Sequence, residues 1–196
     1  MLLSLCGTPG TGKTTSGAIL ARSGIPVISL GDLIKDLGLT EGYDPVSGSD
    51  IVDVDKLRDA LEGWAVQIGL PTVLEGHLSY LAPSDLCLML RLHPDALHAR
   101  LRDRGYTEEK CRENAEAEYV GTLMSWAIEE EVARLKDRPW EDLPPGCGIV
   151  LENDVTEMGP EEIAVWVRGS MDAFLGKGLN DLRPYRPGKV DWLEVL

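Results

Sequence analysis

The chain has 196 residues, with 33 Asp and Glu against 19 Lys and Arg, so its formal net charge is −14. The length suits one domain, and a hydrophobic content of 43% is enough for a buried core. The acidic balance argues against nonspecific binding to a nucleic-acid backbone. It is compatible with simple solubility, a salty cytoplasm or a basic protein partner.

Compartment is indicated by three negative features of the sequence. No run of 18 apolar residues occurs, so no membrane span is predicted. The N-terminus lacks the basic region and cleavage site of a secretory signal. The four cysteines are Cys6, Cys87, Cys111 and Cys147. No C-x-x-C spacing occurs among them, which favours free thiols over zinc ligands or disulfides. We therefore expect a cytoplasmic protein.

The first elements in the chain form a strand, a glycine-rich turn and a helix. Residues 2–6 are apolar, residues 7–14 read G-T-P-G-T-G-K-T, and a helix is predicted over residues 14–23. This is the spacing of the phosphate-binding loop. Its glycines let successive N–H groups turn inward, and the helix N-terminus adds partial positive charge. The alternative is an ordinary glycine-rich turn in a βα unit, but both flanks favour nucleotide binding.

Three side chains at the end of this loop carry the expected chemistry. Lys13 is positioned to contact the β- and γ-phosphates of a bound nucleotide, and the Thr14 hydroxyl to bind Mg²⁺. Thr15 can offer a hydroxyl or N–H group to the α-phosphate. The loop therefore predicts a binding site for a magnesium nucleotide.

Strands and helices are predicted to alternate through the remaining chain. Residues 26–30, 72–75, 85–92 and 147–151 are predicted strands. One helix is predicted from about residue 31 to Gly38, and a second from residue 54 toward 68 with Asp53 as its cap. Further helices are predicted over residues 95–102, 107 to about 136 with Thr107 as the cap, and 160–175. Residues 41–49 are predicted to be loop-like, because Gly42, Pro45 and Gly48 interrupt them. The pattern predicts an α/β fold with a parallel sheet, whose ligands bind beyond the carboxyl ends of the strands.

Two of those strand ends carry candidate catalytic side chains. Glu75 ends the strand T-V-L-E, where a carboxylate can hold Mg²⁺ through water, and Asp32 competes for that role or orients the acceptor phosphate. His77 could position an attacking water or stabilise phosphate charge, although a lone histidine is as readily a structural residue.

Basic residues before Gly105 are candidates for a closing lid. Arg100 and Arg104 are four residues apart on a predicted helix and could clamp phosphates and neutralise transition-state charge. The alternative is a solvated basic face. Lys35 belongs to the segment that we expect on the acceptor side. The five tryptophans are interpreted as packing residues rather than base-stacking ones, with Trp126 on an apolar helix face.

The order of these motifs resembles the adenylate kinases, and most closely the short atypical branch called isoenzyme 6 or the CINAP type, which has archaeal members. The matching stretches are G-T-P-G-T-G-K-T-T, I-S-L-G-D-L-I, E-G-H-L-S, R-L-x-x-R-G-Y-T-E-E-K-x-R-E-N-x-E-A-E and P-E-E-I-A. They span about residues 1 to 170. The resemblance implies a P-loop kinase fold with a five-stranded parallel sheet flanked by helices.

The resemblance also implies a division of the single domain 1–196. The core would comprise residues 1–28, 54–102 and 114–175, with a monophosphate-binding insert at 29–53, a short lid at 103–113 and a tail at 176–196. It implies ATP contacts from Gly10, Gly12, Lys13, Thr14 and Thr15 in the loop and Arg104 in the lid. Asp32 and Lys35 would bind substrate, and Thr14 and Glu75 would hold Mg²⁺.

The activity implied is ATP + AMP ⇌ 2 ADP, with an ATPase side activity and a role in maturing the small ribosomal subunit beside one of its basic proteins. Sequence-specific nucleic-acid binding is not expected. The chain departs from ordinary adenylate kinases at Lys35, where they place Arg, and after Glu75-Gly76-His77, where an arginine is missing. Two rivals remain open: a nucleotide-switched assembly factor whose kinase turnover is incidental, and a kinase of another small acceptor.

Overall fold

Five parallel strands form the central sheet of the computed structural model, in the order β2-β5-β1-β6-β7. The structure describes residues 1–44, 49–135, 146–176 and 178–192. The strands are β1 (Leu2–Gly7), β2 (Val27–Ser29), β5 (Thr72–Glu75), β6 (Leu86–Arg91) and β7 (Ile149–Asp154). The predicted α/β fold with a five-stranded parallel sheet is thereby confirmed.

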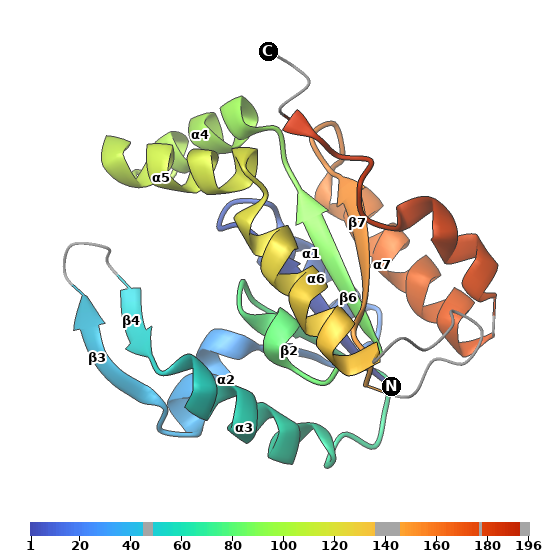
Figure 1. Cartoon of the computed structure of the whole chain (residues 1–196). Helices are drawn as coiled ribbons and strands as arrows, with labels where there is room; N and C mark the ends of the chain where they lie inside the picture. Colours follow the sequence, from blue (N-terminus) through green and yellow to red (C-terminus); the bar gives the residue numbers. More distant parts are fainter. Residues whose placement is uncertain (45–48, 136–145, 177, 193–196) are drawn as a thin grey trace.

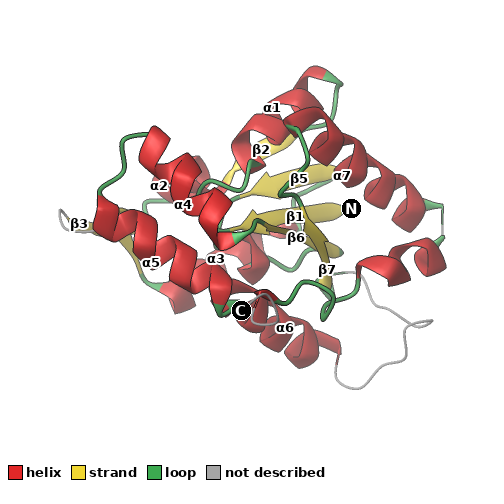
Figure 2. Cartoon of the chain, turned by 90° about the horizontal axis from the view of Figure 1, so that it is seen from above, coloured by secondary structure: helices red, strands yellow, loops and turns green. Residues whose placement is uncertain are grey.

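Helices cover both faces of this sheet (Figures 1 and 2). Figure 2 shows α1 (Lys13–Arg22) and α7 (Pro160–Leu175) on one side, and α3 (Val54–Ala65) and α6 (Thr122–Leu135) on the other. The remaining helices are α2 (Leu30–Asp36), α4 (Pro94–Asp103), α5 (Glu108–Tyr119) and the short turns η1 (Ser79–Leu81) and η2 (Leu179–Tyr185).

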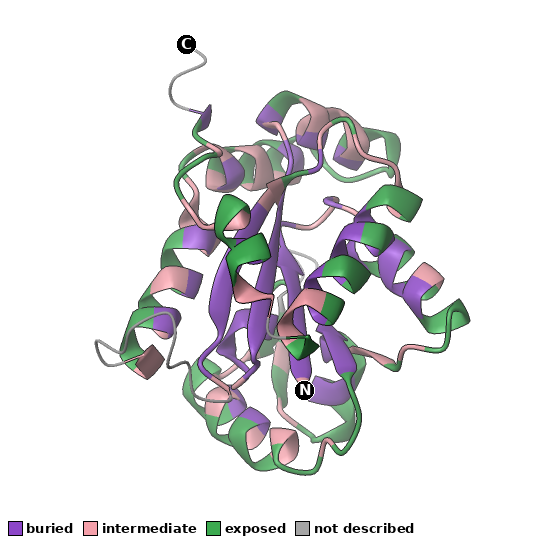
Figure 3. Cartoon of the chain, turned by 90° about the vertical axis from the view of Figure 1, so that its right-hand side faces the viewer, coloured by how far each residue is buried: buried purple, intermediate pink, exposed green. Residues whose placement is uncertain are grey.

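Side-chain alternation along the strands divides the core into two layers. On β1, Leu3 and Leu5 face the layer containing α1 and α7, whereas Leu2 and Cys6 face the layer containing α3 and α6. β6 alternates in the same way, which explains why its sequence is apolar without interruption. Figure 3 shows the strands buried and the outer faces of the helices exposed. Truncating a fully buried leucine such as Leu88 would cost about 2–5 kcal/mol of stability.

The segment predicted as a loop at 41–49 is instead part of an antiparallel hairpin. β3 (Thr40–Asp44) pairs with β4 (Ser49–Val52) as a separate two-stranded sheet that projects from the body in Figure 1. Gly42 does not end the strand, because the pairing register shifts between Thr40 and Gly42 and this bulge accommodates the glycine. Pro45 and Gly48 lie outside the described residues.

The single long helix predicted from residue 107 is two helices. Thr107 caps α5 as expected, with its hydroxyl accepting from the Lys110 N–H group at 3.3 Å. Gly121 then adopts φ +67°, which ends α5 and starts α6 in a new direction. Lys136, the predicted end, lies outside the described residues. The prediction missed this break because one glycine inside a charged, helix-favouring run is a weak signal.

A helix cap, the cysteines and the C-terminal tail agree with the predictions from the sequence. Asp53 caps α3, accepting from the N–H groups of Asp55 and Lys56. All four cysteines are free and buried, as predicted. Across the described ranges, no helix combines the length and apolar character needed to cross a bilayer. The tail lies along the body as far as Trp192, which is buried.

Candidate active site

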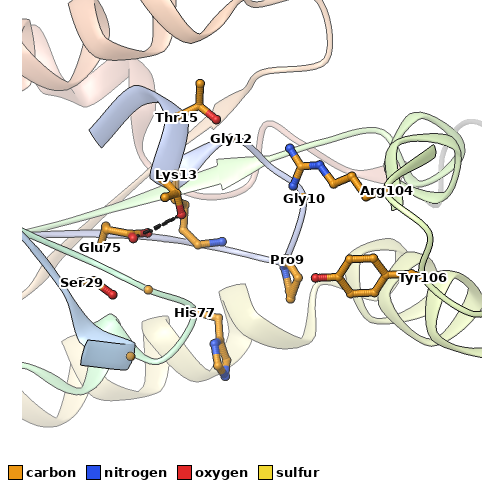
Figure 4. Close-up of a pocket in the computed structure, with 13 residues that line it drawn as sticks. Pro9, Gly10, Gly12, Lys13, Thr15, Ser29, Glu75, His77, Arg104 and Tyr106 are labelled. Carbon is orange, nitrogen blue, oxygen red and sulfur yellow. Dashed lines mark hydrogen bonds between the residues drawn. The ribbon is translucent and has the colours of Figure 1, made fainter. Parts of the chain in front are cut away.

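A cavity of about 280 Å³ opens at the carboxyl ends of β1, β2 and β5. It is lined by the phosphate loop, by the ends of two neighbouring strands and by the turn after α4: Pro9, Gly10, Gly12, Lys13, Thr14, Thr15, Ser29, Gly31, Glu75, Gly76, His77, Arg104 and Tyr106. Figure 4 shows the side chains of this cavity. Its position is the one expected for ligands of a parallel α/β sheet.

The backbone of the loop depends on glycine at two positions in particular. Gly10 has φ +100° and Gly12 has φ +106°, which side-chain-bearing residues rarely adopt. A Cβ atom at Gly10 would also lie 2.8 Å from a methyl carbon of Leu97 on α4. Gly12 is the N-cap of α1 and has no side chain to bond the first N–H groups of the helix. Those N–H groups are therefore placed to bind an anion.

Lys13 is held against the loop by two backbone carbonyls. Its Nζ donates to the oxygens of Gly7 at 2.6 Å and Thr8 at 3.0 Å, and only 8% of the residue is exposed. Burial lowers the pKa of Lys13, although the negative charges around it oppose the shift. The loop thus concentrates a poorly solvated positive charge beside the cavity, where phosphate would stabilise it.

Thr14 and Glu75 form the oxygen-rich side of the cavity. The Thr14 hydroxyl lies 3.2 and 3.3 Å from the two carboxylate oxygens of Glu75 (Figure 4, dashed line). The parallel pairing of β1 with β5, which sets Leu5 beside Glu75, brings these two residues together. A hydroxyl and a carboxylate at this separation are suitable ligands for Mg²⁺, which binds few protein groups and keeps water or phosphate oxygens.

His77 extends from the segment after β5 along the wall of the same cavity. Its ring is open to solvent in the cavity, yet the loss of solvation from surrounding protein, together with the charge of Lys13, lowers its pKa to about 4. The ring is therefore neutral at physiological pH in the nucleotide-free protein. A neutral imidazole can donate one N–H group to a phosphate oxygen or contact a water molecule, so both roles stay predictions.

Arg104 and Tyr106 reach the cavity from the opposite side. Arg104 ends α4, and Gly105 turns the chain with φ +82° before Thr107 starts α5. Figure 4 shows both side chains projecting toward Pro9 and Gly10 of the loop. This arrangement places a guanidinium and a phenol where they can contact a nucleotide on the loop.

The structure does not bring every predicted residue to the cavity. Arg100 lies one turn earlier on α4 and does not line the cavity; Asp32 and Lys35 are exposed on α2 and also lie outside its lining. Ser29 and Tyr106 do line it but were missed by the sequence reasoning. Their positions, directly at the end of β2 and two residues after Arg104, were the signals that could have indicated them.

A second cavity, of about 300 Å³, lies between α3, η1 and α6. Its lining combines apolar, aromatic and ion-paired side chains: Val54, Arg58, Leu78, Tyr80, Trp126, Glu129 and Glu130. Trp126 is 47% exposed, so the prediction that it sits on an apolar, packed helix face was wrong. Leu78 follows His77 directly in sequence, and the segment 75–80 thus contributes to both cavities.

Comparison with known proteins agrees with this site. Residues 4–121 match the family model described as "AAA domain". A "Putative adenylate kinase" of Methanosarcina barkeri is 33% identical and aligns over 100% of both chains. Proteins of the same description from Pyrococcus abyssi (35%; 100% of this chain, 93% of the relative) and Methanothermobacter thermautotrophicus (36%; 97% and 96%) also match. The chain belongs to this archaeal family of adenylate kinase homologues.

Membership of the family confirms the resemblance inferred from the motifs. The relatives extend over the whole chain, whereas the AAA-domain match ends at Gly121, where α5 meets α6. The residues of the family match therefore include the loop, Glu75, His77 and Arg104, which line one cavity. Among solved structures, a shikimate kinase from Bacteroides thetaiotaomicron aligns with a TM-score of 0.43 and 20% identity over 70% of this chain and 96% of its own.

Proposed function

We propose that the protein is a nucleoside-monophosphate kinase that transfers the γ-phosphate of ATP to AMP, giving two ADP. The observation that carries this proposal is the shared cavity of the phosphate loop, Thr14 and Glu75, together with the name that its archaeal relatives bear. The loop N–H groups and Lys13 would hold the triphosphate, and Arg104 would contact it from the other side.

Mg²⁺ is the cofactor that the oxygen ligands suit. Thr14 and Glu75 would hold it, directly or through water, and the cation would neutralise charge on the phosphates when bound. Within the described residues no group of three or more His, Cys, Asp and Glu side chains forms a metal cluster. The remaining ligands would therefore come from phosphate and water.

The second cavity is the proposed site of the acceptor base. Trp126 offers an exposed aromatic face, and Val54 and Leu78 add apolar surface, as a planar purine requires. Because the segment 75–80 joins this cavity to the first, the acceptor's phosphate would lie toward His77 and Ser29. Asp32 and Lys35 would then assist only from outside the cavity lining.

Catalysis in this proposal consists of positioning and charge stabilisation, without a covalent intermediate on the protein. Lys13 and Arg104 stabilise negative charge, and Glu75 fixes the cation. The neutral ring of His77 can contact the acceptor or a water molecule. A misplaced water would give the ATPase side reaction in which free phosphate is the product.

The rival function is a nucleotide-switched assembly factor in the cytoplasm, in which hydrolysis releases a basic small-subunit ribosomal protein. The net charge of −14 is compatible with such a basic partner, as it is with simple solubility. Both activities could belong to one protein, because both would use the same nucleotide site.

An acceptor-dependent assay tests the proposal. Purified protein is incubated with ATP and Mg²⁺, alone or with AMP, other monophosphates, shikimate or a basic ribosomal protein, and ADP and free phosphate are quantified separately. The proposal predicts that AMP accelerates ATP consumption and that ADP forms without equivalent free phosphate. Acceleration by the ribosomal protein alone, with free phosphate as product, would support the rival, and preference for another acceptor would reassign the substrate.

A further inference from the structure

A buried chain of charged groups connects the phosphate loop to the C-terminal segment. Thr8, the second residue of the loop, donates its hydroxyl to Glu118 Oε2 at 2.5 Å. The other oxygen of Glu118 accepts from Arg91 Nε at 2.6 Å and from the Leu92 N–H group at 3.4 Å. Only 3% of Glu118 is exposed. Both carboxylate oxygens of Glu118 are thus hydrogen-bonded, one to the loop and one to the end of β6.

Arg91 continues this chain to Glu152 on β7. Its Nη1 lies 3.3 Å from Glu152 Oε2, while Nη2 donates to the Glu118 carbonyl at 3.2 Å. Arg91 is buried, so each guanidinium edge needs a partner. The guanidinium is therefore fixed between two carboxylates that come from different parts of the sequence.

The far end of Glu152 is held by the tail. Its Oε1 accepts from the backbone N–H groups of three successive residues, Gly188, Lys189 and Val190, at 2.7, 2.7 and 3.1 Å. Gly188 has φ +104°, a conformation that suits glycine and lets the amides converge. The Trp192 ring lies against the Arg91 guanidinium, with 6.0 Å between the ring centroid and the guanidinium carbon. Figure 1 shows this C-terminal segment running beside β7 toward α4.

We propose that Glu118 is a positioning residue of the phosphate loop, and that the docked tail (residues 188–192) sets its position through Glu152 and Arg91. The Thr8 carbonyl that accepts from Lys13 Nζ belongs to the residue whose hydroxyl Glu118 holds. Glu118 therefore fixes the part of the loop against which Lys13 rests. If the tail leaves Glu152, one buried carboxylate oxygen loses three donors and the Arg91 pairing changes with it.

This inference rests on the proposed binding of ATP at the loop. Its test measures the affinity of the full-length protein for MgATP by calorimetry in Thr8→Val, Glu152→Gln and the double variant. Each single change should raise Kd about 10-fold, because Thr8→Val removes the hydrogen bond to the Glu118 carboxylate and Glu152→Gln removes the charge that pairs with Arg91. The double variant should raise Kd by much less than the product of the two, because both act through Glu118.

Glu131→Gln is a matched control. Glu131 is also a buried carboxylate, on α6, and its Oε1 accepts from Arg186 Nη1 of the same C-terminal segment at 2.5 Å. If loosening the C-terminal segment only destabilised the fold, Glu131→Gln would lower the Tm as well. Its Kd for MgATP should stay within about twofold of wild type.

The outcomes separate the two proposals. Absence of MgATP binding by wild type would overturn the proposed function, and this inference with it. Wild-type binding with an unchanged Kd in Thr8→Val and Glu152→Gln, or a multiplicative effect in the double variant, would overturn the inference alone. If Glu152→Gln proved unfolded, an unchanged Kd in Thr8→Val would still contradict it.

Discussion

The Thr14 hydroxyl and the Glu75 carboxylate lie 3.2 Å apart, although 60 residues separate them in the chain. Thr14 opens α1 directly after the loop, and Glu75 ends β5, which pairs with β1. Two groups that could bind a cation are therefore held by the most buried part of the sheet. This rigidity is what a magnesium site in a phosphoryl-transfer enzyme needs.

Glu75→Gln tests the magnesium role. The amide keeps the size of the side chain but removes its charge, so we expect turnover to fall about 10- to 100-fold and the Mg²⁺ concentration for half-maximal rate to rise. The measurement is a magnesium titration of ADP formation. Asp32→Asn is the control, since Asp32 is exposed and outside the cavity lining. A larger effect from Asp32→Asn would transfer the cation role to that residue.

Lys13→Ala should abolish both phosphoryl transfer and hydrolysis, with a loss of at least about 100-fold in kcat, because the charge that meets the phosphates is removed. Lys110→Ala removes an equal charge from the surface of α5, where Lys110 pairs with Glu113, and should leave the rate unchanged. Steady-state kinetics with separate ADP and phosphate detection would measure both reactions. Near-normal turnover in folded Lys13→Ala would remove Lys13 from the mechanism.

Arg104 and Arg100 should differ, although they lie one turn apart. Arg104 lines the cavity and Arg100 does not. Arg104→Ala should therefore lower kcat/KM for ATP about 10- to 100-fold, through loss of charge-assisted hydrogen bonds. Arg100→Ala should change it less than threefold or so. Equal losses in both variants would show that the turn after α4 rearranges when nucleotide binds.

Trp126→Ala should raise KM for AMP about 10-fold, because stacking on an aromatic ring contributes on this scale. KM for ATP should not change, and Trp126→Phe should retain most of the AMP affinity. Val132→Ala, at an exposed position on the same helix, provides the control. An unchanged KM for AMP in Trp126→Ala would place the acceptor base elsewhere.

The depressed pKa of His77 predicts acid sensitivity of the nucleotide-free protein. The unfolded chain takes up this proton near pH 6.5, but the folded protein does so only near pH 4. Between those values the unfolded state binds more protons, so stability falls as the pH is lowered through this window. His77→Gln, which cannot ionise, should show a smaller decrease in urea-unfolding free energy between pH 6.5 and 4. An identical decrease in both proteins would contradict the low pKa.

His77 also allows the kinase and hydrolysis reactions to be compared. If its neutral ring contacts water rather than phosphate, His77→Ala should reduce hydrolysis more than AMP phosphorylation. The two rates are measured in one reaction from free phosphate and ADP. Equal losses, with the fold intact, would assign His77 a role common to both reactions.

The sequence by itself determined the features that depend on neighbouring residues. The loop spacing requires only residues 7–14, and the caps at Asp53 and Thr107 require only the next three residues. The apolar run at residues 85–92 predicted the strand that the structure shows as β6. In each case the physical cause lies within one turn or one strand, so the pattern was sufficient to predict the structure.

Only the tertiary structure decided which distant residues meet. Trp126 is exposed beside Tyr80 because α6 starts in a new direction at Gly121, and Arg104 rather than Arg100 lines the cavity because the turn at Gly105 aims it there. The pairing of Glu118 with Thr8 and Arg91 joins three elements whose separation in sequence hides their contact. Such contacts follow from sheet order and helix packing, which depend on the summed burial of the whole core rather than on local pattern.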